Sequence, residues 1–190
     1  MNPRKKLVIS GLGFGGLYTF LYLHRLGHRA IKDFEIVLVN CTNYFLFTPL
    51  LHEVATGGVG QQNIIQSIRQ ILKCCVADFC EAQVQGVDLP KQIVKTSGGE
   101  VAYDYLVLAL GSTTNFFKVP GAQEHSFTLK NLEDARRLKN RMIEAFARRE
   151  KLRLVLVGGG PTGVELALEM IQYARQLARV HPNIKPEEIE

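Results

Sequence analysis

Two stretches of the 190-residue chain place a glycine-rich turn directly behind a run of apolar residues. The turns hold Gly11, Gly13 and Gly16 behind Leu7-Val8-Ile9, and Gly158, Gly160 and Gly163 behind Leu154-Val155-Leu156-Val157. In a G-x-G-x-x-G turn the first glycine allows a sharp bend, the second lets backbone approach a pyrophosphate, and the third lets helix and strand pack closely. The spacing therefore predicts two phosphate-binding turns of the dinucleotide type.

The chemistry expected at each turn needs no basic side chain. A helix is expected to start near Gly13 and near Gly160. The unpaired N–H groups and the dipole at a helix N-terminus favour negative charge. A turn that binds no ligand is the alternative for each motif, but the strand and helix patterns on either side favour binding.

The elements that must position the first turn follow from hydrophobic patterning. Residues 5–10 and 34–40 read as strands on either side of a helix over residues 13–26, which makes a βαβ unit. Residues 63–73 have helical spacing, and residues 82–103 read as a small antiparallel meander. Residues 105–110 form an apolar run typical of a buried parallel strand.

A domain boundary is expected at Val119-Pro120-Gly121, which divides the chain into 1–118 and 119–190. The second part predicts a helix over 131–149, a strand over 152–157 and a helix over 160–178. A Rossmann half also needs the strand that follows, so the chain is expected to be an N-terminal portion of a longer protein. The fold class is thus α/β with two Rossmann-like domains, the first carrying the meander and the second incomplete.

Composition excludes several classes of protein. With 46% hydrophobic and 22% charged residues, the chain is expected to be globular. The uncharged stretch 7–24 behind Arg4-Lys5-Lys6 imitates a signal peptide or membrane span, but three glycines interrupt it and Arg25 follows. A net charge of +5 is too small to indicate nucleic-acid binding. The basic stretch 136–153 is expected to be a solvated helix face, with contact to an anionic membrane as the alternative.

The four cysteines show neither zinc-site spacing nor a C-x-x-C pair. They are Cys41, Cys74, Cys75 and Cys80. Reduced, partly buried thiols in a cytoplasmic setting are expected.

Longer motifs carry a resemblance to a known family. These are the first turn with its strand (8–16), Asn43 to Leu51 (N-Y-F-L-F-T-P-L-L), 53–57, 103–112 and 158–166. The chain resembles the flavoproteins with two dinucleotide-binding domains, in the pyridine nucleotide-disulfide oxidoreductase superfamily. Among these it is similar to the type II NADH:quinone oxidoreductases, and F-L-F-T-P-L-L is specific to that branch.

The resemblance implies an FAD site on the first turn and an NADH site on the second. Residues implied for FAD are Gly11, Gly13, Phe14, Gly15, Gly16, Asn40, Thr48, Pro49, Leu50, Ala109, Gly111 and Ser112. Residues implied for NADH are Gly158, Gly160, Pro161, Thr162, Gly163 and Glu165. Glu165 is the catalytic candidate, near the nicotinamide and flavin, with a solvated or dipole-compensating carboxylate as the alternative.

Two positions depart from the superfamily's usual pattern. Asn40 stands where the superfamily usually has Glu or Asp for the adenosine ribose, so its neutral amide oxygen is expected to accept the hydroxyl hydrogen bond. Leu110 replaces the threonine of an Ala-Thr-Gly motif. The FAD site is therefore expected to depend more on its other residues than on residue 40.

The implied reaction passes hydride from NADH to flavin and then two electrons to a quinone, without a metal. His52 and Glu53 are candidates for proton delivery to the quinone, with ordinary loop polarity as the alternative. The resemblance further implies a peripheral location on the inner, cytoplasmic face of the cell membrane through segments outside this sequence. A homodimer is possible, and no nucleic acid is expected as a partner.

Competing interpretations come from enzymes and from a binding module. A sulfide:quinone oxidoreductase uses cysteines near the flavin, whereas no cysteine follows Cys80 here. A disulfide reductase would carry a Cys-x4-Cys pair early in the first domain, but Cys74 and Cys80 lie too far apart and too late. A nucleotide-binding module without turnover remains open. The 190-residue piece alone is expected to bind flavin weakly and to show little quinone reductase activity.

Overall fold

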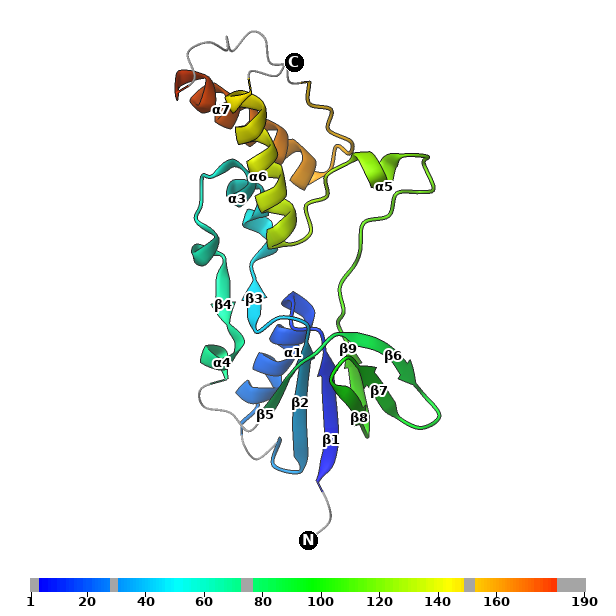
Figure 1. The fold of residues 1–190 in the computed structure, drawn as a ribbon. Coiled ribbons are helices and arrows are strands. Elements are labelled where there is room, and N and C mark those ends of the chain that lie inside the picture. The colour runs from blue at the N-terminus through cyan, green and yellow to red at the C-terminus, as the bar shows by residue number, and fades with distance from the viewer. Residues whose placement is uncertain (1–3, 28–30, 73–76, 149–152, 181–190) are drawn as a thin grey trace. The chain divides into compact units, whose positions relative to one another are not determined.

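The chain groups into two compact units by its internal contacts (Figure 1). The computed structural model describes residues 4–27, 31–72, 77–148 and 153–180. The first unit comprises Met1–Leu46 and Ile65–Ser112, and the second comprises Phe47–Ile64 and Thr113–Glu190.

The first unit is built on a parallel sheet with the order β5-β2-β1-β9. Strand β1 (Lys5–Ser10) pairs with β2 (Phe34–Asn40) and β9 (Tyr105–Leu108), and β5 (Ala77–Glu81) pairs with the far side of β2. Helix α1 (Phe14–Arg25) connects β1 to β2. The predicted βαβ unit is confirmed, because parallel neighbours require such a crossover.

Both faces of the central strands β1 and β2 are buried, which explains their nearly continuous apolar runs. The burial predicted for the strand over 105–110 is not found, because Tyr105 and Leu108 of β9 are exposed. On the face that carries α1, the buried cluster includes Ile9, Leu38 and Phe20. On the opposite face, Val8 and Val39 pack with Val94 of the meander. The meander itself, predicted over 82–103, is confirmed as β6 (Val84–Asp88), β7 (Ile93–Thr96) and β8 (Gly99–Ala102), paired in that order.

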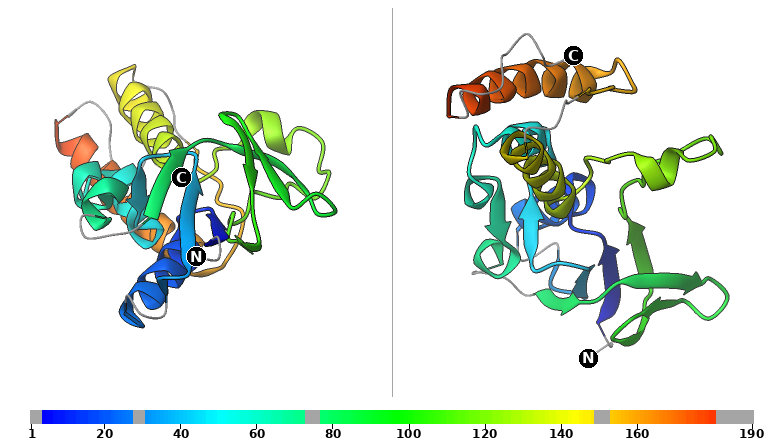
Figure 2. Two further views of the ribbon diagram at one scale, coloured as in Figure 1. Left: turned by 90° about the horizontal axis from the view of Figure 1, so that it is seen from below. Right: turned by 45° about the horizontal axis from the view of Figure 1, so that its top comes forward.

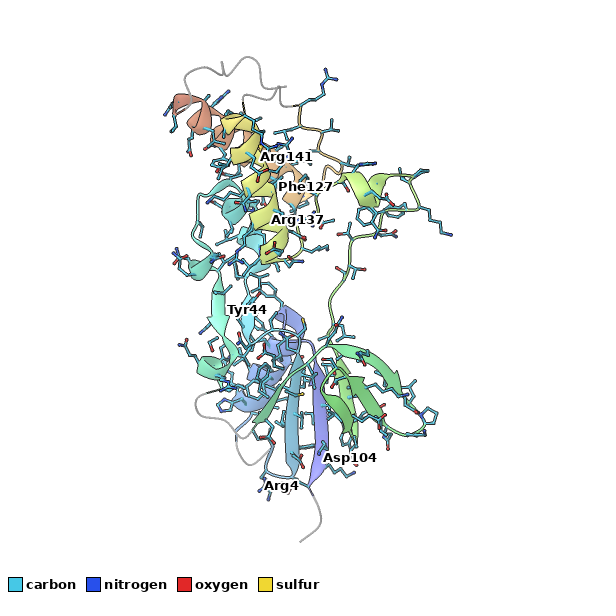
Figure 3. All side chains as sticks on the ribbon, viewed as in Figure 1. Arg4, Tyr44, Asp104, Phe127, Arg137 and Arg141 are labelled. Atoms are coloured by element: carbon cyan, nitrogen blue, oxygen red, sulfur yellow. The ribbon has the colours of Figure 1, made fainter. Side chains whose placement is uncertain are left out.

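Residue contacts also hold the lower end of β1 in place. The Lys6 backbone N–H donates to Asp104 Oδ2 over 2.6 Å, just before β9 begins. Figure 3 labels Asp104 and Arg4 near this end of the strand. The bond fixes the entry to β9 beside the strand with which it pairs.

The helix predicted over residues 63–73 is wrong for most of its length. Residues Ile65–Ser67 form β4, which pairs antiparallel with β3 (Tyr44–Leu46), and only Ile68–Ile71 form helix α4. A 3₁₀ turn over Gln61–Asn63 precedes them. Isoleucine suits strands as well as helices, so pairing with β3 decides the conformation. Lys73 lies outside the described residues.

Two strand boundaries also differ from expectation. Strand β5 was not predicted, because its residues, Ala-Asp-Phe-Cys-Glu, show only a weak alternation of apolar and polar side chains. The strand predicted over 105–110 ends at Leu108, and Ala109 instead donates its N–H to the Ser10 carbonyl over 2.8 Å. Pairing with distant strands decides both cases: β5 forms because it pairs with β2, and the extent of β9 is set by its pairing with β1.

The second unit contains three packed helices, α3 (Leu51–Thr56), α6 (Leu132–Ala147) and α7 (Pro161–Val180). The unit also contains the short elements η1 (Thr48–Leu50), η2 (Gln61–Asn63) and α5 (Ala122–His125). The two views of Figure 2 show α6 and α7 as its long helices. Their buried apolar side chains include Leu51, Val54 and Ala55 of α3, Ala135, Leu138, Met142 and Phe146 of α6, and Met170, Tyr173 and Ala174 of α7.

Helix α6 begins with a reciprocal cap. The Asn131 side chain accepts the Asp134 N–H over 2.9 Å, and Asp134 Oδ2 accepts the Lys130 N–H over 2.8 Å. The bond to Asn131 satisfies one of the N–H groups that the helix leaves unpaired, and the bond from Lys130 fixes the residue before the cap. The helix predicted over 131–149 is thereby confirmed up to Ala147. The exposed side of α6 carries Arg137, which lies over the Phe127 ring at 5.8 Å (Figure 3).

Burial changes the acidity of one side chain in this helical unit. Tyr173 of α7 is buried, and its desolvation raises the pKa of the phenol above its ordinary value. Among the residues that the structure describes, no helix combines the length and apolarity that a membrane span requires.

The strand predicted over 152–157 does not form in the described residues 153–157. A strand exists through hydrogen bonds to a neighbour, and no described segment of this unit pairs with it. Its apolar side chains remain accessible, with Val155 exposed to 79% and Val157 to 94%. Leu152 lies outside the described residues. Helix α7 behind it is confirmed, with Val180 as its last residue.

The contact grouping differs from the division at residue 119 predicted from the sequence. Residues Phe47–Ile64 group with the later part of the chain, because α3 packs its apolar side on α6 and α7. The assignment of 1–118 to FAD and 119–190 to NADH stays a prediction.

Helix α1 offers a matched test of the core of the first unit. Phe20→Ala should lower the free energy of unfolding by about 3–5 kcal/mol, because Phe20 is 1% exposed in the cluster on the sheet. Tyr22→Ala, two residues on and 66% exposed, should change it by less than about 0.5 kcal/mol. Urea unfolding followed by circular dichroism measures both, and equal effects would contradict this core assignment.

Candidate functional site

The first glycine turn connects the end of β1 to the start of α1. Gly11 has φ +89°, a conformation that L side chains rarely adopt. A Cβ on Gly11 would overlap the Ala109 carbonyl oxygen, and a Cβ on Gly16 would overlap the Gly11 carbonyl oxygen. The first and third glycines are therefore required by the fold of the turn itself.

The second glycine of this turn is required by nothing in the fold. A Cβ built on Gly13 meets no atom within 4 Å in the described structure, and its φ of −71° suits any residue. Both Gly13 and Gly15 are exposed. Open space at the second glycine is what close approach of a pyrophosphate to backbone requires.

The start of α1 has the electrostatic character of an anion site. Gly13 is the N-cap residue and offers no side chain to cap the helix, and the first turn contributes only uncharged side chains. Unpaired N–H groups at the start of a 12-residue helix attract negative charge. These residues therefore fit the phosphates of a dinucleotide.

The structure brings two further predicted residues against this turn. Asn40 ends β2, and its Oδ1 accepts the Leu12 N–H over 2.9 Å. Ala109 follows β9, and its Cβ would lie 3.5 Å from a Cβ on Gly15. Gly111, with φ +78°, and Ser112 follow Ala109 and are exposed.

Sequence reasoning missed Ser10, the last residue of β1. Its hydroxyl is fully buried and, in the described part of the chain, is the buried side-chain polar atom that lacks a hydrogen-bond partner. A buried hydroxyl without a partner is uncommon and costs stability. A serine between Ile9 and Gly11 is visible in the sequence, but its burial follows only from the sheet.

The second glycine turn repeats the geometry of the first within the second unit. Gly158 has φ +116°, and a Cβ on Gly163 would overlap the Gly158 carbonyl oxygen. Gly160 has open space around it, and Pro161 and Thr162 are exposed at the start of α7. The turn therefore takes the close-packed form without a paired strand in front of it.

Two predicted polar residues meet in the second unit. His52 of α3 is 9% exposed, and its Nδ1 lies 3.7 Å from Glu165 Oε2 on α7. The Glu165 side chain is 53% exposed, so the pair joins a buried imidazole to a carboxylate that reaches solvent. Such a pair can hold or pass on a proton.

Other predicted residues of this unit lie near α3. Thr48 and Pro49 form an exposed 3₁₀ turn with the half-buried Leu50, directly before the helix. Glu53 places its Oε2 beside Gly58, whereas His52 places its Nδ1 beside Glu165. The structure thus separates His52 from Glu53, which sequence reasoning had treated alike.

Comparison with known proteins identifies a family. The model of the pyridine nucleotide-disulphide oxidoreductases matches residues 5–186. An external alternative NAD(P)H-ubiquinone oxidoreductase B1 of Solanum tuberosum mitochondria is 34% identical in an alignment that spans 209 positions with its gaps and covers 97% of this chain and 35% of the relative. A probable mitochondrial NADH-ubiquinone oxidoreductase of Schizosaccharomyces pombe is 36% identical and covers 90% of this chain and 34% of its own length. The chain thus spans about a third of these curated relatives.

Solved structures agree with this similarity. NDH2 from Plasmodium falciparum in complex with NADH matches with a TM-score of 0.87 and 25% identity, over 98% of this chain and 41% of that one. The sulfide:quinone oxidoreductase from Aquifex aeolicus matches with a TM-score of 0.76 and 26% identity, over 90% and 40%.

Alanine substitutions should separate the glycines needed for folding from those needed only for a ligand. Gly16→Ala should lower the free energy of unfolding by about 1–3 kcal/mol, because the new Cβ overlaps the Gly11 carbonyl. Gly13→Ala should change it by less than about 1 kcal/mol, since its Cβ enters open space. Thermal and urea unfolding measure both, and a Gly16→Ala protein as stable as the unsubstituted one would contradict the close approach.

Proposed function

Because the chain belongs to the pyridine nucleotide-disulphide oxidoreductase family, we propose that the protein is an FAD-dependent oxidoreductase that oxidises NADH and reduces a membrane quinone. One observation carries the proposal: the same close-packed glycine turn occurs twice, each with an open second glycine. The names of the ubiquinone oxidoreductase relatives support the choice of quinone as acceptor.

In this proposal the first turn binds FAD. Backbone N–H groups at the start of α1 receive the pyrophosphate, Gly13 leaves room for it, and Ala109, Gly111 and Ser112 close the site. The assignment of Thr48, Pro49 and Leu50 to the isoalloxazine comes from the resemblance and stays a prediction. The FAD, when bound, supplies two-electron redox chemistry between a nicotinamide and a quinone.

The second turn binds NADH in the same way. Gly160 leaves room for the pyrophosphate of the nicotinamide dinucleotide, and Pro161 sets the start of α7 without losing a helical hydrogen bond. The chain's contribution to this step is to hold the dinucleotide in place and oriented.

The pair of His52 and Glu165 supplies a proton route. Reduction of a quinone by NADH consumes one proton from solution in addition to the hydride. An exposed carboxylate beside a buried imidazole can take up that proton and pass it on. In this proposal Glu165 is the catalytic residue, which takes up the proton that quinone reduction consumes.

Partners and location belong to this proposal as well. Attachment to the inner face of a membrane and a homodimer are predicted from the family resemblance. The curated relatives described above are mitochondrial by name, whereas the sequence interpretation placed this protein at a cell membrane. A sulfide:quinone oxidoreductase is the alternative on structural similarity, and within these 190 residues no cysteine follows Cys80.

Substitutions at the second glycines test the two sites separately. Gly13→Ala should weaken FAD binding at least about tenfold, equivalent to about 1.4 kcal/mol, without lowering thermal stability. Gly160→Ala should keep FAD binding but slow reduction of the flavin by NADH. Flavin fluorescence titration and the fall in absorbance at the flavin band on adding NADH measure the two steps.

Gly86→Ala is the control for both substitutions, because Gly86 also has open space but lies in the meander. A wild-type protein that binds no FAD at any concentration would overturn the proposal. FAD binding without reduction by NADH would instead favour a nucleotide-binding module without turnover.

Glu165→Gln tests the proton route. In the longer protein of which this chain is expected to be an N-terminal portion, the substitution should lower NADH:quinone turnover about 100-fold, as expected for loss of an acid-base group, with FAD affinity unchanged. Glu169→Gln, one helical turn further along α7, is the matched control. Equal turnover in the Glu165→Gln and Glu169→Gln proteins would contradict the role of Glu165.

A further inference from the structure

Asn40 holds the middle residue of the first glycine turn. Leu12, between Gly11 and Gly13, donates its N–H to Asn40 Oδ1 over 2.9 Å. The Leu12 side chain is 1% exposed and belongs to the core cluster on the α1 face of the sheet. The turn is thus fixed at its centre by the Leu12 side chain in the core and by the hydrogen bond that the Leu12 N–H donates to Asn40.

The backbone that carries Asn40 is rigidly mounted. On one side, the Gly11 N–H donates to the Val39 carbonyl over 2.8 Å, and on the other the Ala82 N–H donates to the Asn40 carbonyl over 2.9 Å. Strand β2 is therefore bonded to both neighbours at its very end. A side chain on such a paired strand is positioned more accurately than one on a loop.

The second end of the Asn40 amide is also occupied. Nδ2 donates to the Thr42 carbonyl over 2.8 Å and to Thr42 Oγ1 over 3.0 Å. Thr42 Oγ1 in turn donates to the Tyr44 carbonyl over 3.1 Å. Tyr44, labelled in Figure 3, begins β3, so one side chain connects the glycine turn to the loop between β2 and β3.

These partners require a neutral amide. An N–H group can only donate and a carbonyl can only accept, so the side chain at position 40 must accept from Leu12 and donate to Thr42. A carboxylate keeps the bond from Leu12 but loses the bond to the Thr42 carbonyl. It can keep a bond to the Thr42 hydroxyl only if that hydroxyl donates to it and gives up the Tyr44 carbonyl. It would also face the Thr42 carbonyl oxygen at hydrogen-bond distance, which is repulsive.

We propose that Asn40 is a positioning residue for the first nucleotide site, which acts by holding the glycine turn in its anion-receiving shape and not through the ribose of the ligand. The identity of that ligand as FAD rests on the proposed function. A loop ordered before binding loses less conformational freedom when the pyrophosphate arrives, so the amide raises affinity without touching the ligand.

Amide hydrogen exchange tests the hydrogen bond without any ligand. In Asn40→Ala the Leu12 amide should exchange at least about tenfold faster than in the wild type, whereas the Gly11 amide, bonded to Val39, should keep its protection. Asn43→Ala, with an exposed asparagine in the same loop, is the control and should leave both amides unchanged. Unchanged exchange at Leu12 in Asn40→Ala would overturn the proposal, and so would equal acceleration at both amides.

Ligand binding separates positioning from ribose contact. Dissociation constants are measured for FAD and for the FAD analogue that lacks the 2′-hydroxyl on the adenosine ribose. Asn40→Ala should weaken both ligands by the same factor of about ten, so the ratio of the two constants stays at its wild-type value. A threefold or larger change in that ratio would show a contact to the ribose and overturn the proposal.

Asn40→Asp tests the need for a neutral amide. It should bind FAD more weakly than the wild type, although it keeps the acceptor for Leu12. Affinity equal to or above that of the wild type would overturn this requirement. A wild-type protein that binds no FAD contradicts the proposed function, whereas exchange at Leu12 still decides whether Asn40 holds the turn.

Discussion

The contact on which the architecture of both turns depends is that of the third glycine with the carbonyl of the first. In the first turn Gly16 lies against the Gly11 carbonyl, and in the second Gly163 lies against the Gly158 carbonyl. Any side chain at the third position would push the helix away from the chain before it. This approach brings the start of the helix, with its unpaired N–H groups, directly over the end of the preceding segment.

The two glycine turns have the same geometry in different surroundings, which shows how much of that geometry depends on neighbouring strands. Around Gly11 the sheet supplies close neighbours, since the Ala109 carbonyl occupies the space of a Cβ and Val39 accepts the Gly11 N–H. Around Gly158 a Cβ would meet no described atom within 4 Å, and residues 153–157 pair with no described strand. The turn geometry recurs all the same, so it follows from the glycines and the helix behind them.

Polar groups of the candidate sites are placed by elements that are distant in sequence. Asn40 is carried by β2 and reaches the turn behind β1, 28 residues earlier. His52 and Glu165 meet because α3 packs on α7. In both cases the packing of apolar side chains fixes where the element lies, and the polar side chains then meet across it. A single hydrogen bond contributes too little net free energy to place a strand or a helix by itself.

Local patterns in the sequence determined both glycine turns, the strands over 5–10 and 34–40, helices α1, α6 and α7, and the meander, because each has its own periodicity or turn chemistry. The three glycines of each turn followed from the same spacing, whereas the other candidate residues came from the family resemblance. Tertiary structure alone decided that Ile65–Ser67 is a strand, that β5 exists, that residues 153–157 are unpaired and that α3 groups with α6 and α7. It also decided the partners of Asn40 and His52, since strand pairing and helix packing join segments whose mutual positions no local pattern records.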